Sequence, residues 1–350
     1  MMPTGCAAVC RAVDSRTVGK PTHARAARGA DLLEKVVRYT GSTVPLAVIA
    51  LDFDPVVRYG DNAVRLETIA LALTILVALL AATAIARRTP VDGPDSSDAR
   101  DGTARLHVDD LVVLVLAIIP GAVAGGRLGY ALLHLDYYAT APLSIIDPGQ
   151  GSLELSLAVV GGALTGTYAA RLIDVHVGRW LDVAALPLLL GIGLGKAAMA
   201  LGGRGQGSPS DAAWATSYVG DRAWASLAPA IPSQPSQLYE AIATLVLLLA
   251  LGVVLWHRPF AQNGLVFLVA LGGWAVVRAL VAATWRDAPV IGPFLAEQLI
   301  CVVIVAGCLV VGTRLARPAF AIPLQPASAE PGVSWRPASD AQDRDSGGSR

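Results

Sequence analysis

Seven long runs of apolar residues follow one another along the chain, with short polar segments between them. Each run approaches the roughly 20 residues that an α-helix needs to cross the hydrocarbon core of a bilayer. We therefore expect an all-α, polytopic membrane protein with about seven transmembrane helices. The runs cover residues 67–86, 111–134, 155–172, 181–201, 238–256, 265–285 and 294–311.

The composition supports this prediction and narrows the class of partner. Of the 350 residues, 54% are hydrophobic and 15% are charged, whereas a soluble domain carries about 25% charged residues. The formal net charge is zero, so nothing in the balance predicts binding to nucleic acid. The cysteines are interpreted as unpaired thiols, because disulfide frameworks are typical of short, loop-rich chains. They are Cys6, Cys10, Cys301 and Cys308.

Three regions are expected. Residues 1–45 are basic and are either a disordered leader or the product of a start codon placed too far upstream. Residues 46–313 form the transmembrane domain, and residues 314–350 are rich in Pro, Ser and Asp, which is typical of a disordered tail. Most Lys and Arg residues near helix ends fall on one side of the membrane. By the positive-inside rule, this charge bias predicts an outer N-terminus and a cytoplasmic C-terminus.

Several ionisable residues lie inside or just beyond the predicted helices. A charge in a membrane helix costs on the order of 2.5–3.5 kcal/mol, so such residues need partners or a polar cavity. Arg127, Lys196, Glu240 and Arg278 are within helices, and Arg204 follows the fourth. This mainly cationic set predicts an anionic, lipid-like ligand, since guanidinium groups bind phosphate with two parallel hydrogen bonds. The alternative is structural pairing, with Glu240 neutralising Arg278 or Arg127.

Glycine-rich segments recur in the second and third helices. Gly126, Gly129 and Tyr130 belong to a Gly-Gly-Arg-Leu-Gly-Tyr segment, and Gly161-Gly162 lies in the third helix. Small residues permit tight helix crossings and bring the backbone close to a bound chain. Simple helix packing explains the same pattern, so both interpretations stay open.

The fifth helix opens with Pro-Ser-Gln-Leu-Tyr-Glu at residues 235–240. Proline suits the first helical turn, where its missing N–H is not needed. Gln237, Tyr239 and Glu240 then place polar groups at the outer mouth of the bundle. Helix capping alone is the alternative interpretation.

These segments together resemble the prolipoprotein diacylglyceryl transferases, collinearly over about residues 50–312. Arg278 in the sixth helix also matches that family's pattern. The resemblance implies transfer of the diacylglyceryl group of phosphatidylglycerol to the lipobox cysteine of an exported prelipoprotein, with no metal or organic cofactor. The other matching segments are Phe53-Asp54-Pro55-Val56, Gly125 to Tyr130, Gly161-Gly162 with Gly166, Pro235 to Glu240, and Glu297-Gln298.

The resemblance implies roles for particular residues. Arg278 is the expected catalytic residue, and it holds the phosphate together with Arg127 and Lys196. Gln237, Tyr239 and Glu240 shape the mouth, Gly126, Gly129 and Tyr130 contact the substrate, and Arg204 reaches a headgroup. The implied partners are phosphatidylglycerol, the prelipoprotein signal peptide and the lipid of a bacterial plasma membrane.

The chain departs from the family's pattern at several positions. Val160 occupies the position where the family carries a His before Gly-Gly. Gly193 to Lys196 occupy the positions where the family carries Arg-x-Gly-Asn. Lys196 lies one turn from the position of the missing Arg, on nearly the same helix face, and can bind phosphate as a point charge. A Tyr of the family's first helix aligns near Glu67, and Trp274 occupies the position of another family Tyr.

Two other functions remain open at this point. A catalytically inactive paralogue would bind anionic phospholipid or prelipoprotein without forming a thioether. A transporter would use the same buried cations, although the chain shows no internal inverted repeat, which is typical of many transporters. His134, the only histidine in a predicted helix, is a weak candidate for a general base.

Overall fold

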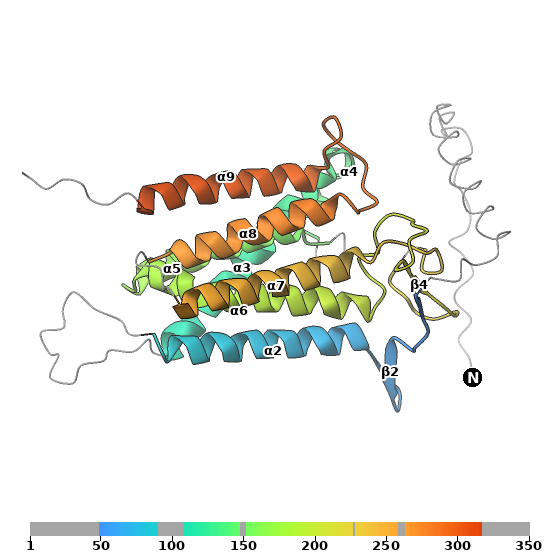
Figure 1. Cartoon of the computed structure of the whole chain (residues 1–350), viewed down its shortest axis with the longest axis horizontal. Helices are drawn as coiled ribbons and strands as arrows, with labels where there is room; N and C mark the ends of the chain where they lie inside the picture. Colours follow the sequence, from blue (N-terminus) through green and yellow to red (C-terminus); the bar gives the residue numbers. More distant parts are fainter. Residues whose placement is uncertain (1–48, 90–107, 148–151, 227, 258–262, 317–350) are drawn as a thin grey trace, which may run out of the picture.

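The computed structural model describes residues 49–89, 108–147, 152–226, 228–257 and 263–316. Seven long helices run side by side along the longest axis of the molecule (Figure 1). The seven predicted runs are therefore confirmed, with ends that shift by a few residues. The helices are α2 (Leu66–Ala86), α3 (Val108–Leu133), α5 (Leu155–Leu172), α6 (Val177–Ala200), α7 (Ser236–His257), α8 (Leu265–Ala282) and α9 (Ala296–Ala316).

These seven helices have the length and composition of membrane spans. Their outward faces carry large apolar side chains; Leu80, Ile242 and Leu280 are 60%, 62% and 70% exposed. A continuous apolar surface of this kind is unfavourable in water and favourable against lipid. The chain is a multi-pass membrane protein, as the sequence predicts.

Glycines set the packing of α3 against α5. A methyl group added to Gly161 would overlap the carbonyl oxygen of Gly121, and one added to Gly125 would overlap the carbonyl of Leu157. Only residues without a side chain allow the two backbones to approach this closely. The packing interpretation of these glycines is therefore confirmed at this crossing.

The other helices pack into a second group. Helix α6 contacts α2, α7 and α8, and α9 packs against α8. The apolar core of this group includes Leu189, Ala270, Trp274 and Cys301, all fully buried. Cys301 and Cys308 are unpaired thiols, as expected, whereas Cys6 and Cys10 lie outside the described residues.

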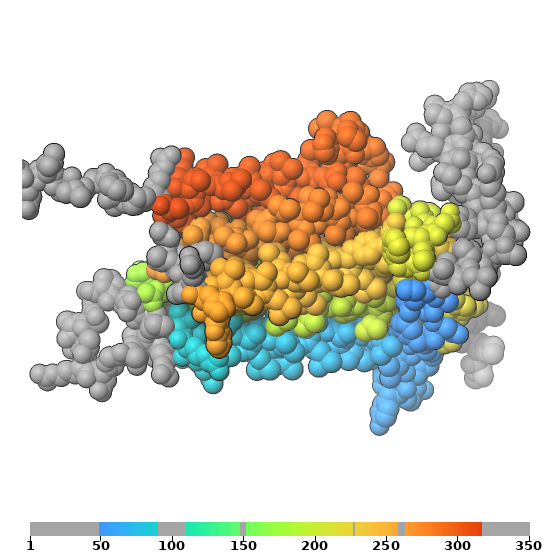
Figure 2. Space-filling model, in the orientation of Figure 1, coloured from blue at the N-terminus to red at the C-terminus, as the bar shows by residue number. Residues whose placement is uncertain are grey.

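Short elements cover one end of the bundle. Strand β1 (Ile49–Leu51) pairs in parallel with β4 (Thr216–Tyr218), and β2 (Val56–Tyr59) forms a hairpin with β3 (Asn62–Arg65) that projects beside α2 (Figure 2). Helices α4 (Leu135–Thr140) and η2 (Pro142–Ile145) follow α3 at the same end (Figure 1). We call residues 49–65, 201–226, 228–235 and 283–295 the cap, and this end of the bundle the cap end.

At the opposite end, a carboxylate fixes the start of α8. Asp182 of α6 accepts hydrogen bonds from the backbone N–H groups of Gly264, at 2.7 Å, and Phe267, at 3.1 Å. Gly264 has φ = +90°, a conformation that glycine adopts without strain. The side chain of one helix thus satisfies free N–H groups at the first turn of another.

Candidate ionic and lipid-binding site

Arg278, near the cap end of α8, forms the centre of a buried ionic cluster. Its guanidinium contacts Glu240 of α7 at 2.9 Å, Glu297 of α9 at 2.6 Å, and Glu154, which precedes α5, at 3.4 Å. Its Nε also donates to the hydroxyl of Ser156 at 2.9 Å. A guanidinium offers five N–H donors in one plane, which suits this many partners. One side chain therefore joins four helices of the bundle.

Glu240 connects a second cation to the cluster. Lys196 Nζ of α6 lies 2.8 Å from Glu240 Oε2, and both side chains are largely buried. The ring of Trp285 lies 4.9 Å from Arg278 Cζ and 5.9 Å from Lys196 Nζ. An aromatic face near two cations adds a favourable electrostatic contact.

The prediction of a mainly cationic cluster is wrong. Two buried cations, Arg278 and Lys196, share three carboxylates, those of Glu154, Glu240 and Glu297. The alternative of structural pairing between Glu240 and Arg278 is confirmed. Any anionic ligand that reaches these cations must therefore compete with carboxylates that are already in place.

Sequence reasoning missed Glu154 and Glu297 as members of this cluster because each stands at the start of a helix, where an acidic residue normally serves as a cap. Glu154 is indeed the N-cap of α5 and accepts hydrogen bonds from the N–H groups of Ser156 and Leu157. One pattern would have revealed the set: four helices each carry one acid at the cap end. These acids are Glu67 (α2), Glu154 (α5), Glu240 (α7) and Glu297 (α9).

Gly126 and Gly129 lie against Glu154. The carbonyl of Gly126 accepts a hydrogen bond from the Glu154 N–H at 2.9 Å. A methyl group on Gly129 would come within 2.8 Å of the Glu154 carboxylate. These two predicted site residues therefore meet the Arg278 cluster through Glu154, whose position they fix.

Arg127 and Tyr130 contact the chain that follows α3. Arg127 donates hydrogen bonds to the carbonyls of Ile145, at 3.2 Å, and Asp147. Tyr130 stacks on the ring of His134 at 4.1 Å. These described contacts hold the segment around η2, and the predicted role of Arg127 as a phosphate ligand remains untested.

The polar residues that open α7 bind the cap to the bundle. Gln237 Nε2 donates to the Tyr218 hydroxyl at 3.2 Å, and that hydroxyl donates to the carbonyl of Ala200 at 2.9 Å. The Tyr239 hydroxyl donates to Gln234 Oε1 at 2.7 Å. Burial raises the pKa of Tyr218, which keeps its phenol protonated as a donor.

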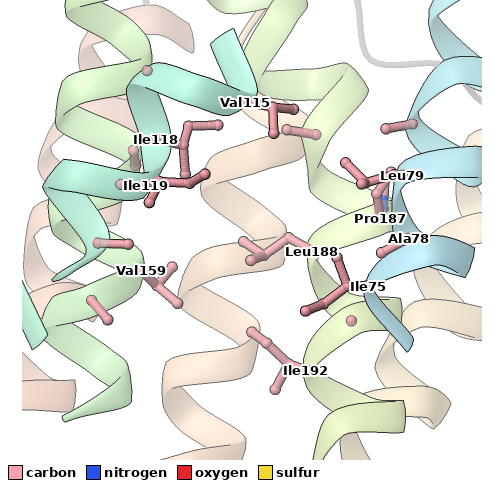
Figure 3. Close-up of a pocket in the computed structure, with 18 of the residues that line it drawn as sticks. Ile75, Ala78, Leu79, Val115, Ile118, Ile119, Val159, Pro187, Leu188 and Ile192 are labelled. Atoms are coloured by element: carbon pink, nitrogen blue, oxygen red, sulfur yellow. The ribbon is translucent and has the colours of Figure 1, made fainter. Parts of the chain in front are cut away.

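A cavity of about 710 Å³ opens between α2, α3, α5 and α6. Its walls are apolar side chains that point into a common space from all four helices (Figure 3). Along α6 the lining includes Trp180 and Lys196, which lie about 24 Å apart at 1.5 Å per residue. The side chains labelled in Figure 3 are Ile75, Ala78, Leu79, Val115, Ile118, Ile119, Val159, Pro187, Leu188 and Ile192.

Three ionisable residues line this cavity, and all of them lie at its cap end. They are Glu67, Lys196 and Arg204. Arg204 pairs with Glu67 at 3.2 Å, and Lys196 joins the cavity to the Arg278 cluster through Glu240. The cavity thus has the polarity of a membrane lipid, with an apolar body and one ionic end. In the described ranges, no group of His, Cys, Asp or Glu side chains is arranged to hold a metal ion.

These features define a polytopic membrane protein with an apolar cavity that ends at paired ionic groups. Residues 56–313 match the model of the family described as prolipoprotein diacylglyceryl transferase, and the chain belongs to that family. The expectation from the sequence is confirmed.

Relatives that carry one name cover much of the chain. The phosphatidylglycerol–prolipoprotein diacylglyceryl transferase of Geobacter sulfurreducens is 29% identical over 179 residues, which is 50% of this chain and 65% of that protein. The protein of that name from Trichormus variabilis is 27% identical over 263 residues, 73% of this chain and 88% of the relative. The protein of that name from Gluconobacter oxydans is 31% identical over 235 residues, which is 65% of this chain and 78% of that protein.

Proposed function

We propose that this protein transfers the diacylglyceryl group of phosphatidylglycerol to the thiol of a lipobox cysteine in a prelipoprotein. The observation that supports this function best is the 710 Å³ apolar cavity whose ionisable lining residues all lie at one end. A phospholipid has the same division between acyl chains and charged headgroup. The names of the relatives supply the two substrates.

In this proposal the acyl chains lie in the apolar part of the cavity and the phosphate lies at its cap end. Lys196 and Arg204 line that end, and Arg278 lies behind Lys196, joined to it through Glu240. The cavity's 24 Å along α6 exceeds the roughly 15 Å depth of one leaflet, half of the hydrocarbon core. The cavity is therefore long enough for an acyl chain that spans one leaflet.

The reaction exchanges one bond for another. The cysteine sulfur attacks the glyceryl carbon that bears the phosphate, a thioether C–S bond forms, and the C–O bond to phosphate breaks. Glycerol 1-phosphate leaves with the bonding electrons, and the thiol proton is released. Cations fixed near the leaving phosphate stabilise its developing charge, and Arg278 and Lys196 are held in place for this role by their carboxylate partners.

Two departures from the family's pattern lie at apolar positions of the structure. Val160 packs against the apolar core, and Gly193 packs against Leu245 of α7. Neither position presents a polar group, so Lys196 is the α6 residue that meets the phosphate. The same observation favours a second candidate function, an inactive paralogue that binds anionic phospholipid without transferring it.

In this proposal the cap faces the cell exterior, where the exported prelipoprotein arrives, and the C-terminus is cytoplasmic in a bacterial plasma membrane. The distribution of arginines near helix ends supports this orientation, because positive residues concentrate on the cytoplasmic side. The end opposite the cap carries Arg87, Arg88, Arg171, Arg179 and Arg314.

The function is tested by incubating the purified full-length protein with labelled phosphatidylglycerol and a lipobox peptide, and detecting the thioether by mass spectrometry. We expect product with the cysteine peptide, none with its serine version, and none with Arg278→Ala. Arg222→Gln is the matched control, since Arg222 pairs with Asp52 on the exposed cap. Lipid binding without product in the unmodified protein would refute transfer and favour the inactive paralogue.

A further inference from the structure

One ion pair closes the cap end of the cavity. Glu67 lies in the first turn of α2, where an acidic side chain normally faces water and interacts favourably with the helix N-terminus. Here it is only 5% exposed and lines the cavity, with Oε1 3.2 Å from Arg204 Nε. A buried carboxylate is unfavourable without a partner, so the position of Glu67 depends on Arg204.

Arg204 is only partly engaged by this pair. Its side chain is 53% exposed, and its two terminal nitrogens make no hydrogen bond within the described part of the chain. It lies between Gly203 and Gly205, with φ of +75° and +76°, which glycine adopts readily and other residues do not. A methyl group on Gly202 would overlap the Glu67 carboxylate. Three glycines close to Arg204 in the chain thus leave room for the ion pair between Glu67 and Arg204.

We infer that Glu67 is an internal competitor for the headgroup phosphate at Arg204. This inference rests on the proposed function, which brings a phospholipid into the cavity. In the lipid-free protein the Glu67 carboxylate occupies the anion position on the guanidinium. A lipid phosphate displaces it from Arg204 Nε and binds Nε together with a terminal nitrogen, a bidentate arrangement that guanidinium groups favour. The glycerol hydroxyls of phosphatidylglycerol then donate to the side-chain oxygen that Arg204 has left, an acceptor that a glutamine at this position also provides.

The consequence is control of lipid affinity by a residue that need not take part in the reaction. Neutralising Glu67 removes the competitor and strengthens lipid binding, but only while Arg204 is present. Two rival roles for Glu67 would give different results. A general effect of negative charge near the headgroup would act with or without Arg204, and a required contact between Glu67 and the headgroup would make neutralisation weaken binding.

The test is a double-mutant cycle on the full-length protein, with phosphatidylglycerol binding measured by native mass spectrometry without acceptor peptide. We expect Glu67→Gln to raise the affinity about two- to fivefold, in line with the strength of a partly exposed ion pair. Arg204→Gln should lower it by a similar factor, and Glu67→Gln should have no effect in the Arg204→Gln background. Asp52→Asn, which neutralises an exposed acid of the cap paired with Arg222, should leave the affinity unchanged.

An increase that persists without Arg204, or a loss of affinity in Glu67→Gln, would overturn the inference. Thermal unfolding checks that each variant is folded. If Glu67→Gln does not fold, Glu67→Tyr replaces it, because the family resemblance places a Tyr near this position. Displacement of the lipid by inorganic phosphate as readily as by unlabelled phosphatidylglycerol would also refute it, because a free phosphate lacks acyl chains. Transfer by the unmodified protein is measured separately, so failure of this inference leaves the proposed function standing.

Discussion

Glu240 supports two cations at once, and its neutralisation is expected to weaken the bundle strongly. It is 1% exposed and contacts Lys196 at 2.8 Å and Arg278 at 2.9 Å. After Glu240→Gln, Arg278 keeps Glu297 and Glu154, whereas Lys196 keeps no ion pair within the described residues. Removing one partner of a buried pair destabilises a protein by about 3–5 kcal/mol. Most of this loss should therefore come from the buried ammonium group of Lys196.

A double-mutant cycle isolates that contribution. If the lysine is the main cause, Lys196→Met should recover part of the stability lost in Glu240→Gln, with a coupling free energy of roughly 1–3 kcal/mol, as for other contacting residues. The free energy of unfolding is measured in mixed detergent micelles by SDS titration. A coupling below about 0.5 kcal/mol would be that of independent sites and would refute the reasoning.

The exposed cap pair provides the comparison. Arg222 and Asp52 lie 2.8 Å apart, as close as Lys196 and Glu240, but their side chains are 36% and 61% exposed. Exposed ion pairs contribute about 0–1 kcal/mol to the free energy of unfolding. The same cycle on Asp52→Asn and Arg222→Gln should therefore give a much smaller coupling, although the distance is the same.

Three further perturbations test other parts of the fold. Asp182→Ala removes the acceptor for two N–H groups at the start of α8 and should destabilise the protein by about 1–2 kcal/mol in the same titration. Gly161→Ala should lower stability by about 1–3 kcal/mol through the α3–α5 crossing, whereas Gly252→Ala, where a methyl group meets nothing within 4 Å, should not lower it. Because burial raises the pKa of Tyr218 above its ordinary value of 10, the folded state favours the neutral phenol. Stability should fall as pH rises above that value, and Tyr218→Phe should flatten this fall; an unchanged slope would contradict the assignment.

The helices could be predicted from the sequence because lipid imposes a simple requirement. A span needs about 20 apolar residues whatever it packs against, and runs such as 67–86 and 265–285 satisfy it. The short cap strands gave no comparable signal. Strand β1 has three residues, and its partner β4 lies far along the chain. Such pairing depends on the tertiary fold, so local sequence could not reveal it.

The site was only partly predictable for a related reason. Arg278 and Glu240 stood out because charges inside membrane helices are rare and need a partner. Glu154 and Glu297 did not, because an acid at a helix start needs no special explanation. Which acid turns inward depends on how four helices come together, and that is a property of packing rather than of any one segment.

The central guanidinium also has a consequence for biosynthesis. Two of its carboxylate partners, Glu154 and Glu240, precede Arg278 in the chain, whereas Glu297 follows on α9, the last helix in the described part of the chain. Until α9 has been made and inserted, the arginine lacks its shortest ion pair inside an apolar bundle. A chain shortened before α9 therefore carries an incompletely neutralised charge, which favours local opening and recognition by proteases and chaperones. Insertion of α9 is thus a condition for a stable, long-lived protein.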